Sequence, residues 1–506
     1  MWIPTTRFVT KLSRCFILGT FCLSGLGKAF GEATDAAGLN GANLSETPVA
    51  AITLAESIAL ALERNPDLAA FSWDIRAAEA RQIQARLRPN PELSLEIEDV
   101  RLGNGPGARA IDKTLAWTPS GLSGQVERSK ESGSLSGFRE SEITLSLSQL
   151  IELGGKRANR MQLAARDRDV SAWDYEVARA DVLKNVAQAF VAVLAAQQRV
   201  ALDTELVQLA EQVFNTVSAR VSAGRVSPLE ATRAKTALST AQVQANSSRR
   251  SLDAARSTLA ASWGDKEAQF ERAEGTLDEV RPIPPLEELR GRVEQNPDLA
   301  RWRAEIEKRQ YAIALERSKA IPDITVIAGF RTRGTPETDA NSFGFGTDGL
   351  SISRGSTRSD SRWENSVVLG LSVPLPLFNR NQGSILETQH LASKASEQRR
   401  ATNVQANARL TSGYQNLATS YDTVTSLRED ILPAATQTFE AVNQAYRQGK
   451  LGYLDVLDAQ HTLFQARQQY LDALALYHVS VAEIERTIGE SIWKTDAANP
   501  SPHEEK

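Results

Sequence analysis

Two aspartates, Asp455 and Asp458, are the side chains whose type and spacing most directly suggest chemistry. They lie in the segment "GYLDVLDAQ" (452–460), next to a predicted helix start. Residues three apart share one face of a helix, so their carboxylates would concentrate negative charge in its first turns. The simplest alternative is that both acids only complement the positive end of the helix dipole.

The other reactive side chains form no second site. The four histidines lack metal-ligand spacing: His390, His461, His478 and His503. The segment "LGGKR" (153–157) lacks the first glycine and the final Ser/Thr of a phosphate-binding loop. No nucleophile–base–acid arrangement is found, and a net charge of −4 gives no nucleic-acid footprint. We therefore expect no enzyme activity, cofactor, resident metal or nucleic-acid partner.

The first 29 residues have the pattern of a secretory signal peptide. Arg7, Lys11 and Arg14 precede the apolar run "CFILGTFCLSGLG" (15–27), which is too short to anchor the chain in a bilayer. Both cysteines, Cys15 and Cys22, belong to this segment. No later run approaches the roughly 20 apolar residues of a membrane helix. Export is therefore expected, to the periplasm, the medium or an outer-membrane β-barrel.

The elements that must position the aspartates occur twice. Three pairs of segments align in the same order: 64–93 with 295–324, 145–159 with 369–383, and 222–242 with 447–467. Collinear self-similarity of this kind indicates an internal duplication. The expected parts are a signal peptide (1–29), an N-terminal extension (30–52), a first repeat (53–275), a second repeat (276–490) and a C-terminal tail (491–506).

Each repeat is expected to fold as helix, strand, strand, long helix, turn and helix. The first helical stretches cover 53–88 and 286–320, the long helices about 157–220 and 383–447, and the returning helices about 228–262 and 453–488. The strands are predicted at 91–100 and 322–333, with returning strands around 143–148 and 367–373. Gly/Ser/Arg-rich loops separate them, at 101–139 and 334–362.

The turns between the long and returning helices carry clear signals. Gly224 and Gly449 suit the left-handed residue that ends a helix. Ser227, Pro228 and Glu230 in "SPLE" predict a capping box, with serine as N-cap, proline at the first helical position and glutamate reaching back. The glycines Gly154 and Gly155 mark another turn, where a strand pattern changes to a helical one.

The four strands have about ten alternating residues each, which is the length of a membrane β-strand. Four strands cannot close a barrel, and open sheet edges are not tolerated in hydrocarbon, so oligomerisation would have to supply the missing strands. An elongated periplasmic coiled-coil adaptor or scaffold is the alternative from another class of protein. It would explain the helices but not the duplicated strand pairs.

The duplicated plan, the motif "NPDL" in both repeats and "LDVLDAQ" (454–460) resemble TolC-type outer membrane efflux proteins. The segments "IELGGKR" (151–157) and "VPLPLFNRNQG" (373–383) resemble the heavy-metal, cobalt–zinc–cadmium branch. The resemblance implies a mainly α fold with a membrane β-barrel part. It also implies a homotrimeric α/β tunnel in which each subunit gives four strands to a shared twelve-stranded barrel.

The resemblance further implies an outer-membrane location, with the helices in the periplasm. The function would be a passive exit conduit for divalent heavy-metal cations. A periplasmic adaptor would join it to an inner-membrane resistance-nodulation-division pump, which supplies the energy. The same conduit for drugs or a type I secreted protein is the alternative.

The family also suggests roles for particular residues. Asp455 and Asp458 would form two carboxylate rings at the closed periplasmic end, which attract cations and can hold an ion that plugs the pore. Tyr446 would help to hold the closed tip, paired with the acid Glu230, whereas Leu451 stands where the family has a gate arginine. The tips would dock the adaptor or pump through Gly224, Ser227, Pro228, Gly449 and Gly452. At the strand-to-helix junction, Lys156 and Arg157, with Arg380 at the matching place, would meet outer-membrane lipid head groups or snorkel.

Overall fold

The structure, a computed structural model, describes residues 49–98, 111–118, 121–128, 141–334, 339–346, 349–354 and 363–493. The expected signal peptide, most of the N-terminal extension and most of the C-terminal tail lie outside these residues. Residues 50–506 form one compact unit, and the main apolar core draws on both repeats, from Val186 and Phe190 to Leu427 and Leu474. The two repeats therefore share a core.

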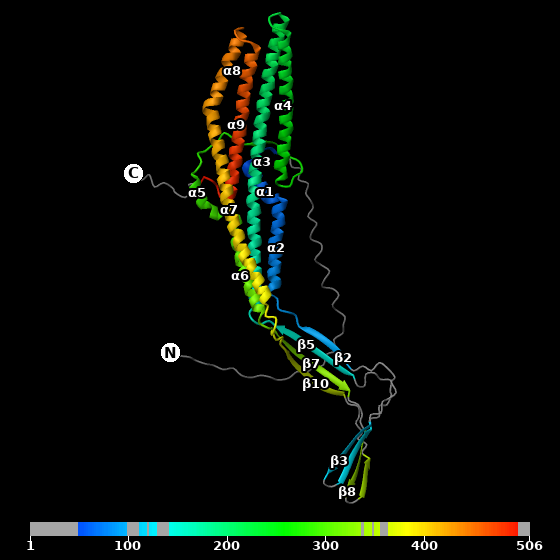
Figure 1. Ribbon diagram of the computed structural model, residues 1–506. Helices are drawn as coiled ribbons and strands as arrows, with labels where there is room; N and C mark the ends of the chain where they lie inside the picture. The colour runs from blue at the N-terminus through cyan, green and yellow to red at the C-terminus, as the bar shows by residue number, and fades with distance from the viewer. Residues whose placement is uncertain are drawn as a thin grey trace, which may run out of the picture. The chain divides into compact units, whose positions relative to one another are not determined.

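The helices of the first repeat are α1 (Leu54–Arg64), α2 (Pro66–Arg86), α3 (Lys156–Ser222) and α4 (Pro228–Ala261). Those of the second are α5 (Leu286–Arg292), the 3₁₀ turn η1 (Val293–Gln295), α6 (Pro297–Lys319), α7 (Gln382–Ser426), the π turn η2 (Leu427–Ile431), α8 (Leu432–Arg447) and α9 (Tyr453–Ile488). Figure 1 shows α3 beside α4, and α8 beside α9.

The helical stretch predicted at the start of each repeat is present, but it is divided before an asparagine–proline step. Asn65 ends α1 and caps α2, because its side chain accepts a hydrogen bond from the Leu68 amide at 3.0 Å. Asn296 caps α6 in the same way. A proline follows each asparagine at the first helical position, which suits a helix start but interrupts a preceding helix.

The two long helices differ between the repeats. The helix α3 runs for 67 residues without interruption, whereas its counterpart is divided into α7 and α8 by the π turn η2. Pro433 stands at the start of α8 and cannot donate a backbone hydrogen bond to the preceding turn. A local change of helical register at such a residue is the expected response, so the helix predicted over about 383–447 is present from Gln382 to Arg447 with a π turn inside it.

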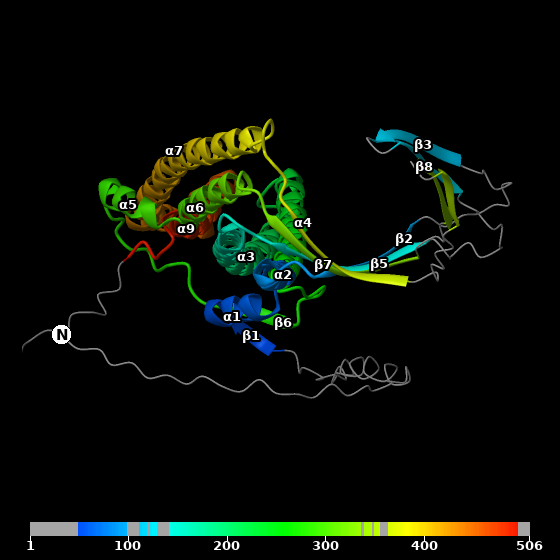
Figure 2. The same ribbon diagram turned by 90° about the horizontal axis from the view of Figure 1, so that it is seen from below.

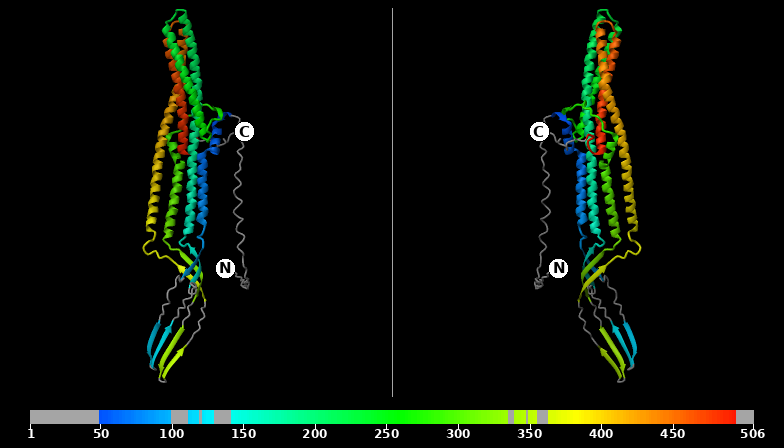
Figure 3. Two further views of the ribbon diagram at one scale, coloured as in Figure 1. Left: turned by 90° about the vertical axis from the view of Figure 1, so that its right-hand side faces the viewer. Right: turned by 90° about the vertical axis from the view of Figure 1, so that its left-hand side faces the viewer.

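A four-stranded antiparallel sheet adjoins the long helices in the chain. Its order is β10 (Trp363–Ser372), β7 (Ile324–Gly334), β5 (Glu142–Ile151) and β2 (Glu92–Glu98). These are the four strands that the alternating pattern predicted. The strands β5 and β10 lead directly toward α3 and α7, and both views in Figure 3 show the sheet at one end of these helices.

The stretches expected to be loops also contain strands. The hairpins β3 (Ile111–Thr118) with β4 (Gly121–Arg128), and β8 (Asp339–Gly346) with β9 (Gly349–Arg354), form a second sheet in the order β3-β4-β8-β9. Glycine and serine are frequent in β4, β8 and β9, and glycine has low strand propensity; β3 contains neither residue. A third, two-stranded sheet pairs β1 (Val49–Thr53) with β6 (Phe270–Glu274).

The strands and the long helices follow the same lateral order. Helix α2 packs on α3, α3 on α6, and α6 on α7, and Figure 2 shows α6 between α3 and α7. The sheet has the matching order β2-β5-β7-β10. Consequently α2 and β2 form one open side of this arrangement, and α7 and β10 form the other.

None of the helices within the described residues is long and apolar enough to cross a membrane.

Candidate functional site: hairpin tips, junctions and sheet faces

The two helical hairpins turn in the same way. Gly224 and Gly449 have φ values of 67° and 75°, in the left-handed region that glycine adopts without steric cost. At the first tip the amides of Gly224 and Arg225 donate back to the carbonyls of Val221 and Arg220, both at 2.9 Å. Gly449 and Lys450 repeat this pattern with Tyr446 and Ala445. The duplicated sequence thus encodes two equal helix ends.

A small core joins the two tips. It consists of Val217, Ala234, Tyr446, Tyr453 and Val456, all buried. Arg220 stacks its guanidinium on the Tyr446 ring at 4.3 Å and donates to the carbonyl of the same residue at 3.1 Å. Burial raises the pKa of Tyr453, and neighbouring Tyr446 raises it further. The two tips are therefore coupled by packing across the repeats.

The capping box predicted at the first tip is only half formed. Ser227 is the N-cap of α4, and Pro228 holds the first helical position. The serine hydroxyl accepts from the Leu229 amide at 3.3 Å, while Glu230 makes no return bond to the serine backbone. A reciprocal box does form at the start of α1, where Thr53 and Glu56 bond to each other's amides.

Tyr446 and Glu230 both leave a buried polar atom without a hydrogen bond. Tyr446 is 4% exposed, and neither its hydroxyl nor Glu230 Oε2 has a partner within the described residues. The contact expected between these two residues is therefore not made inside one chain. Buried polar atoms without partners are rare and call for an explanation.

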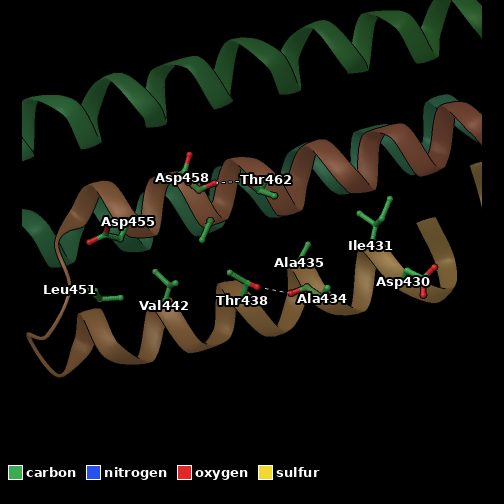
Figure 4. A pocket seen from close by; sticks show the side chains of 11 residues that line it. Asp430, Ile431, Ala434, Ala435, Thr438, Val442, Leu451, Asp455, Asp458 and Thr462 are labelled. Atoms are coloured by element: carbon green, nitrogen blue, oxygen red, sulfur yellow. Dashed lines mark hydrogen bonds between the residues drawn. The ribbon is translucent and has the colours of Figure 1, made fainter. Parts of the chain in front are cut away.

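The aspartates of the second tip line a groove between α8 and α9. Its volume is about 600 Å³, and its lining includes Asp455 and Asp458 on α9 and Thr438 and Val442 on α8. Figure 4 shows these side chains, with the carboxylate of Asp458 directed away from α8. Asp455 Oδ2 accepts from the Gly452 amide at 2.9 Å, which is helix capping. The carboxylate of Asp458 has no such partner in the described part of the chain.

The groove is not by itself a metal centre. Within the described residues, no three His, Cys, Asp or Glu side chains gather in a way that could hold a metal ion. In one chain, the acidic pair therefore offers charge at the tip, not a coordination sphere.

The strand-to-helix junction of the first repeat is tightly packed. Gly154 and Gly155 lie between β5 and α3 with φ values of 68° and 72°. A Cβ on Gly154 would lie 2.9 Å from two carbon atoms of Ile321, whereas one on Gly155 would meet open space. In the second repeat, Asn381 caps α7 with a φ of 61°. It is the structural counterpart of Gly155.

This equivalence corrects the alignment at the junction. Arg380 precedes the cap of α7 and corresponds to Gly154, not to Lys156. Its side chain donates to the Pro376 carbonyl at 3.3 Å.

The junction cations are held by the protein itself. Lys156 Nζ lies 2.7 Å from Asp323 Oδ1, with its side chain only 11% exposed. Arg157 Nε donates to the Arg86 carbonyl at 2.8 Å. The expectation that Lys156 would meet lipid head groups or snorkel is therefore wrong for this side chain. Its ion pair instead fastens α3 to the residue just before β7.

The four-stranded sheet has one apolar and one polar face. Register places Leu95, Leu145, Phe330 and Val367 in one row across the four strands, and Leu93, Leu147, Ala328 and Leu369 in the next. The large side chains of these rows are exposed, Leu369 at 80%. Such a contiguous apolar surface requires a covering medium or partner.

The opposite face carries charges that the sequence analysis did not single out. Arg331 Nε lies 2.7 Å from Glu142 Oε1, and Arg333 Nε lies 3.6 Å from Glu142 Oε2. Ser94 and Ser146 share a hydrogen bond of 2.7 Å on the same face. The signal was present as polar residues alternating with apolar ones in β5, which begins with Glu142, and as Arg331 and Arg333 in β7.

Comparison with known proteins gives consistent matches. The outer membrane efflux protein family model matches residues 57–265 and 292–490. The cobalt-zinc-cadmium resistance protein CzcC of Cupriavidus metallidurans is 32% identical over 438 residues, covering 87% of this chain and 90% of that protein. The nickel-cobalt-cadmium resistance protein NccC of Alcaligenes xylosoxydans xylosoxydans is 24% identical, covering 74% and 71%.

Solved structures agree with the fold. The crystal structure of CusC has a TM-score of 0.63 at 15% identity, with 87% of this chain and 92% of that chain covered. The channel VceC from Vibrio cholerae has a TM-score of 0.62 at 17% identity, with 87% and 97% covered. With a family match over most of its length, this chain belongs to the outer membrane efflux proteins.

Proposed function

We propose that this protein is the outer-membrane channel of a tripartite efflux system, serving as a passive exit conduit for divalent heavy-metal cations. The observation that carries the proposal is the four-stranded sheet, which is apolar on one exposed face and charged on the other. Alternation of this kind suits a barrel wall between lipid and an aqueous lumen. The strands continue directly into long helices, which would extend the conduit into the periplasm.

A homotrimer would complete the wall. The edge strands β2 and β10 present unpaired backbone groups, which hydrocarbon does not tolerate. Three copies would pair each β10 with the next β2 and give a shared twelve-stranded barrel. Because α2 and α7 occupy the same two sides as β2 and β10, the helices could close into a tunnel by the same rotation.

The acidic tips would form the periplasmic gate. Threefold symmetry would place three copies of Asp455 and Asp458 around one axis, where their charge attracts cations and opposes passage while the tip is narrow. The unpartnered Tyr446 hydroxyl and Glu230 oxygen would find partners across subunits or on rearrangement of the tips. The turns at Gly224 and Gly449, with Ser227, Pro228 and Gly452, would meet a periplasmic adaptor or an inner-membrane resistance-nodulation-division pump.

The metal substrate is supported by the relatives. CzcC and NccC are named for resistance to cobalt, zinc, cadmium and nickel, and the former is similar over most of both chains. The channel itself needs no resident metal site to serve this role, since a pump can select the ion. Drugs or a secreted protein passing through the same conduit remain the competing substrates.

The test is intracellular metal content in a strain that lacks the gene. The strain is challenged with zinc, cobalt, cadmium, nickel and copper in turn, beside a drug panel, with the wild-type gene restored on a plasmid as control. Accumulation of one or two metals, reversed by the plasmid, is expected. Normal metal content with drug hypersensitivity would remove the metal assignment and leave the conduit.

A further inference from the structure

The two strand-to-helix connections of the sheet differ sharply. The first, from β5 to α3, spans only residues 152–155 and packs Gly154 against Ile321. The second, from β10 to α7, spans residues 373–381 and leaves large apolar side chains uncovered. Leu375 is 73% exposed, Leu377 65% and Phe378 92%. We call Leu375, Leu377 and Phe378 the apolar linker.

The apolar linker lies on one open side of the molecule. It joins β10 and α7, which are the last strand and the last helix in the shared lateral order. The other open side is formed by β2 and α2. Since α2 ends at Arg86 shortly before β2 begins, and α7 begins at Gln382 shortly after β10 ends, both sides present their helix ends at the level of the sheet.

The end of α2 offers a matching surface. Ile83 and Leu87 are 64% and 52% exposed there. The neighbouring Arg86 and Arg88 are exposed, and their guanidinium groups make no ion pair within the described residues. Apolar side chains next to unpaired cations are typical of a surface that a partner covers.

The first turns of α7 complement this charge. Leu386 is exposed beside the apolar linker, and Glu387 is exposed without an ion pair in the part of the chain that the structure describes. An apolar strip with the unpaired acid Glu387, and with the exposed Arg380 donating to the Pro376 carbonyl, thus lies on one side of the molecule. An apolar strip with unpaired bases lies on the other, at the same level.

We propose that the apolar linker of one copy packs on the last turn of α2, at Ile83 and Leu87, of a second copy of this chain, with Glu387 near Arg86 and Arg88. The inference rests on the proposed ring of identical subunits and names the contact that clamps strands and helices together at their junction. A lipid surface would cover the apolar linker equally well. It would not account for the opposite charges on the two sides.

Cysteine cross-linking tests the contact in the assembled protein. Both native cysteines lie in the first 29 residues. The variants that carry only one of the two substitutions show whether a native cysteine takes part in any cross-link. Phe378→Cys is combined with Leu87→Cys in intact cells, and the membranes are treated with a short bismaleimide. Covalent dimers and trimers are expected for the pair and only background for each single variant. The matched control combines Phe378→Cys with Ile321→Cys. Ile321 is exposed but lies at an interior position of the lateral order, so this double variant should stay monomeric.

The oligomeric state is measured separately by native mass spectrometry of the detergent-purified protein. Trimers without a Phe378–Leu87 cross-link would overturn the inference and leave the proposed channel intact. Absence of trimers would instead count against the proposed channel assembly. Quenching of a Phe378→Trp variant by brominated lipid, with no cross-link, would assign the apolar linker to the bilayer and also overturn the inference.

Discussion

At the residue scale, Asp455 and Asp458 share a helix face but differ in their contacts. Asp455 accepts a hydrogen bond from the Gly452 amide, so its carboxylate supports the start of α9. Asp458 has no side-chain partner among the described residues. Substitution at Asp458 therefore separates the electrostatic role proposed for the gate from helix capping.

We expect Asp458→Asn to weaken block of the channel by multivalent cations about tenfold, because one carboxylate per subunit is lost. This factor corresponds to about 1.4 kcal/mol of binding free energy. Conductance in planar bilayers, with the cation titrated on the periplasmic side, measures the block. Asp472→Asn, on the same helix but in an exposed ion pair with Arg199, should leave it unchanged. Unaltered block in the Asp458 variant would show that this charge does not face the pore.

Arg486 is the residue that most clearly ties distant helices together. Its guanidinium contacts Asp181 on α3 at 2.8 Å and Asp298 on α6 at 2.7 Å, with the side chain 11% exposed. Burial alone would lower the pKa of Arg486, but the hydrogen bonds that its guanidinium donates to both carboxylates raise it above its usual range. The cation is therefore fixed where α3, α6 and α9 meet.

Arg486→Met should destabilise the fold by about 3 kcal/mol, since it leaves two partly buried carboxylates without their common cation. Thermal unfolding followed by circular dichroism in detergent measures the loss. Arg467→Met is the matched control on the same helix, because its partner Glu205 is 57% exposed and such a pair contributes about 0.5 kcal/mol. Equal shifts for both variants would contradict the role given to burial.

Residue types alone predicted the turn glycines and the acidic pair, because these depend on local geometry. They could not predict Arg486, whose partners lie 305 and 188 positions away. Even local sequence signals did not always predict the hydrogen bonds of a helix cap. "SPLE" has the composition of a reciprocal box but forms half of one, whereas Thr53 and Glu56 form the complete box and were not singled out.

At the scale of elements, the β5–α3 junction depends on the left-handed backbone of two glycines and on the space around one of them. Both Gly154 and Gly155 are left-handed, which costs a residue with a Cβ about 1–2 kcal/mol. Only Gly154 also faces Ile321, where an added methyl overpacks the contact by about another 1–3 kcal/mol.

Gly154→Ala should consequently destabilise the fold more than Gly155→Ala, and Gly155→Asn should be nearly neutral, because Asn381 holds the same left-handed cap in α7. Thermal unfolding of the three variants, with the amount of protein in the outer membrane as a second readout, gives the ranking. Equal effects of alanine at both positions would mean that Ile321 moves away without penalty.

The remaining differences between elements have physical causes that a pattern does not carry. The apolar residues around Pro433 keep the spacing of a helix. Periodicity therefore did not reveal the π turn before it. The strands β3, β4, β8 and β9 lie in stretches rich in glycine, serine and arginine, and their pairing joins the two repeats. Such pairing is a long-range property that local propensity does not report.

At the scale of the whole molecule, the duplication predicted two equal series of elements but not their lateral order. The sheet keeps the strands of each repeat together, and the repeats meet where β5 of the first lies beside β7 of the second; α3 lies beside α6 in the same way. This common order is what gives the molecule two open sides. It follows from how the repeats pack on each other, which sequence similarity between them does not specify.

The faces of the sheet allow a direct test of whether this order serves a membrane wall. Leu369 on β10 belongs to the apolar face, whereas Ser366 on the same strand pairs in register with Arg331 of the polar face. Leu369→Lys should reduce stability by about 2–4 kcal/mol per copy if that position faces the middle of the bilayer, and so lower the amount of folded protein in the outer membrane.

Ser366→Lys is the matched control, and it should assemble normally because its side chain would face an aqueous lumen. Heat-modifiable migration of outer-membrane fractions on gels compares the two variants, and ion selectivity in planar bilayers reports the lumen charge. Opposite results, with Ser366→Lys lost and Leu369→Lys retained, would mean that the apolar face does not lie against the hydrocarbon of the bilayer. The charged face would then need another explanation than a lumen.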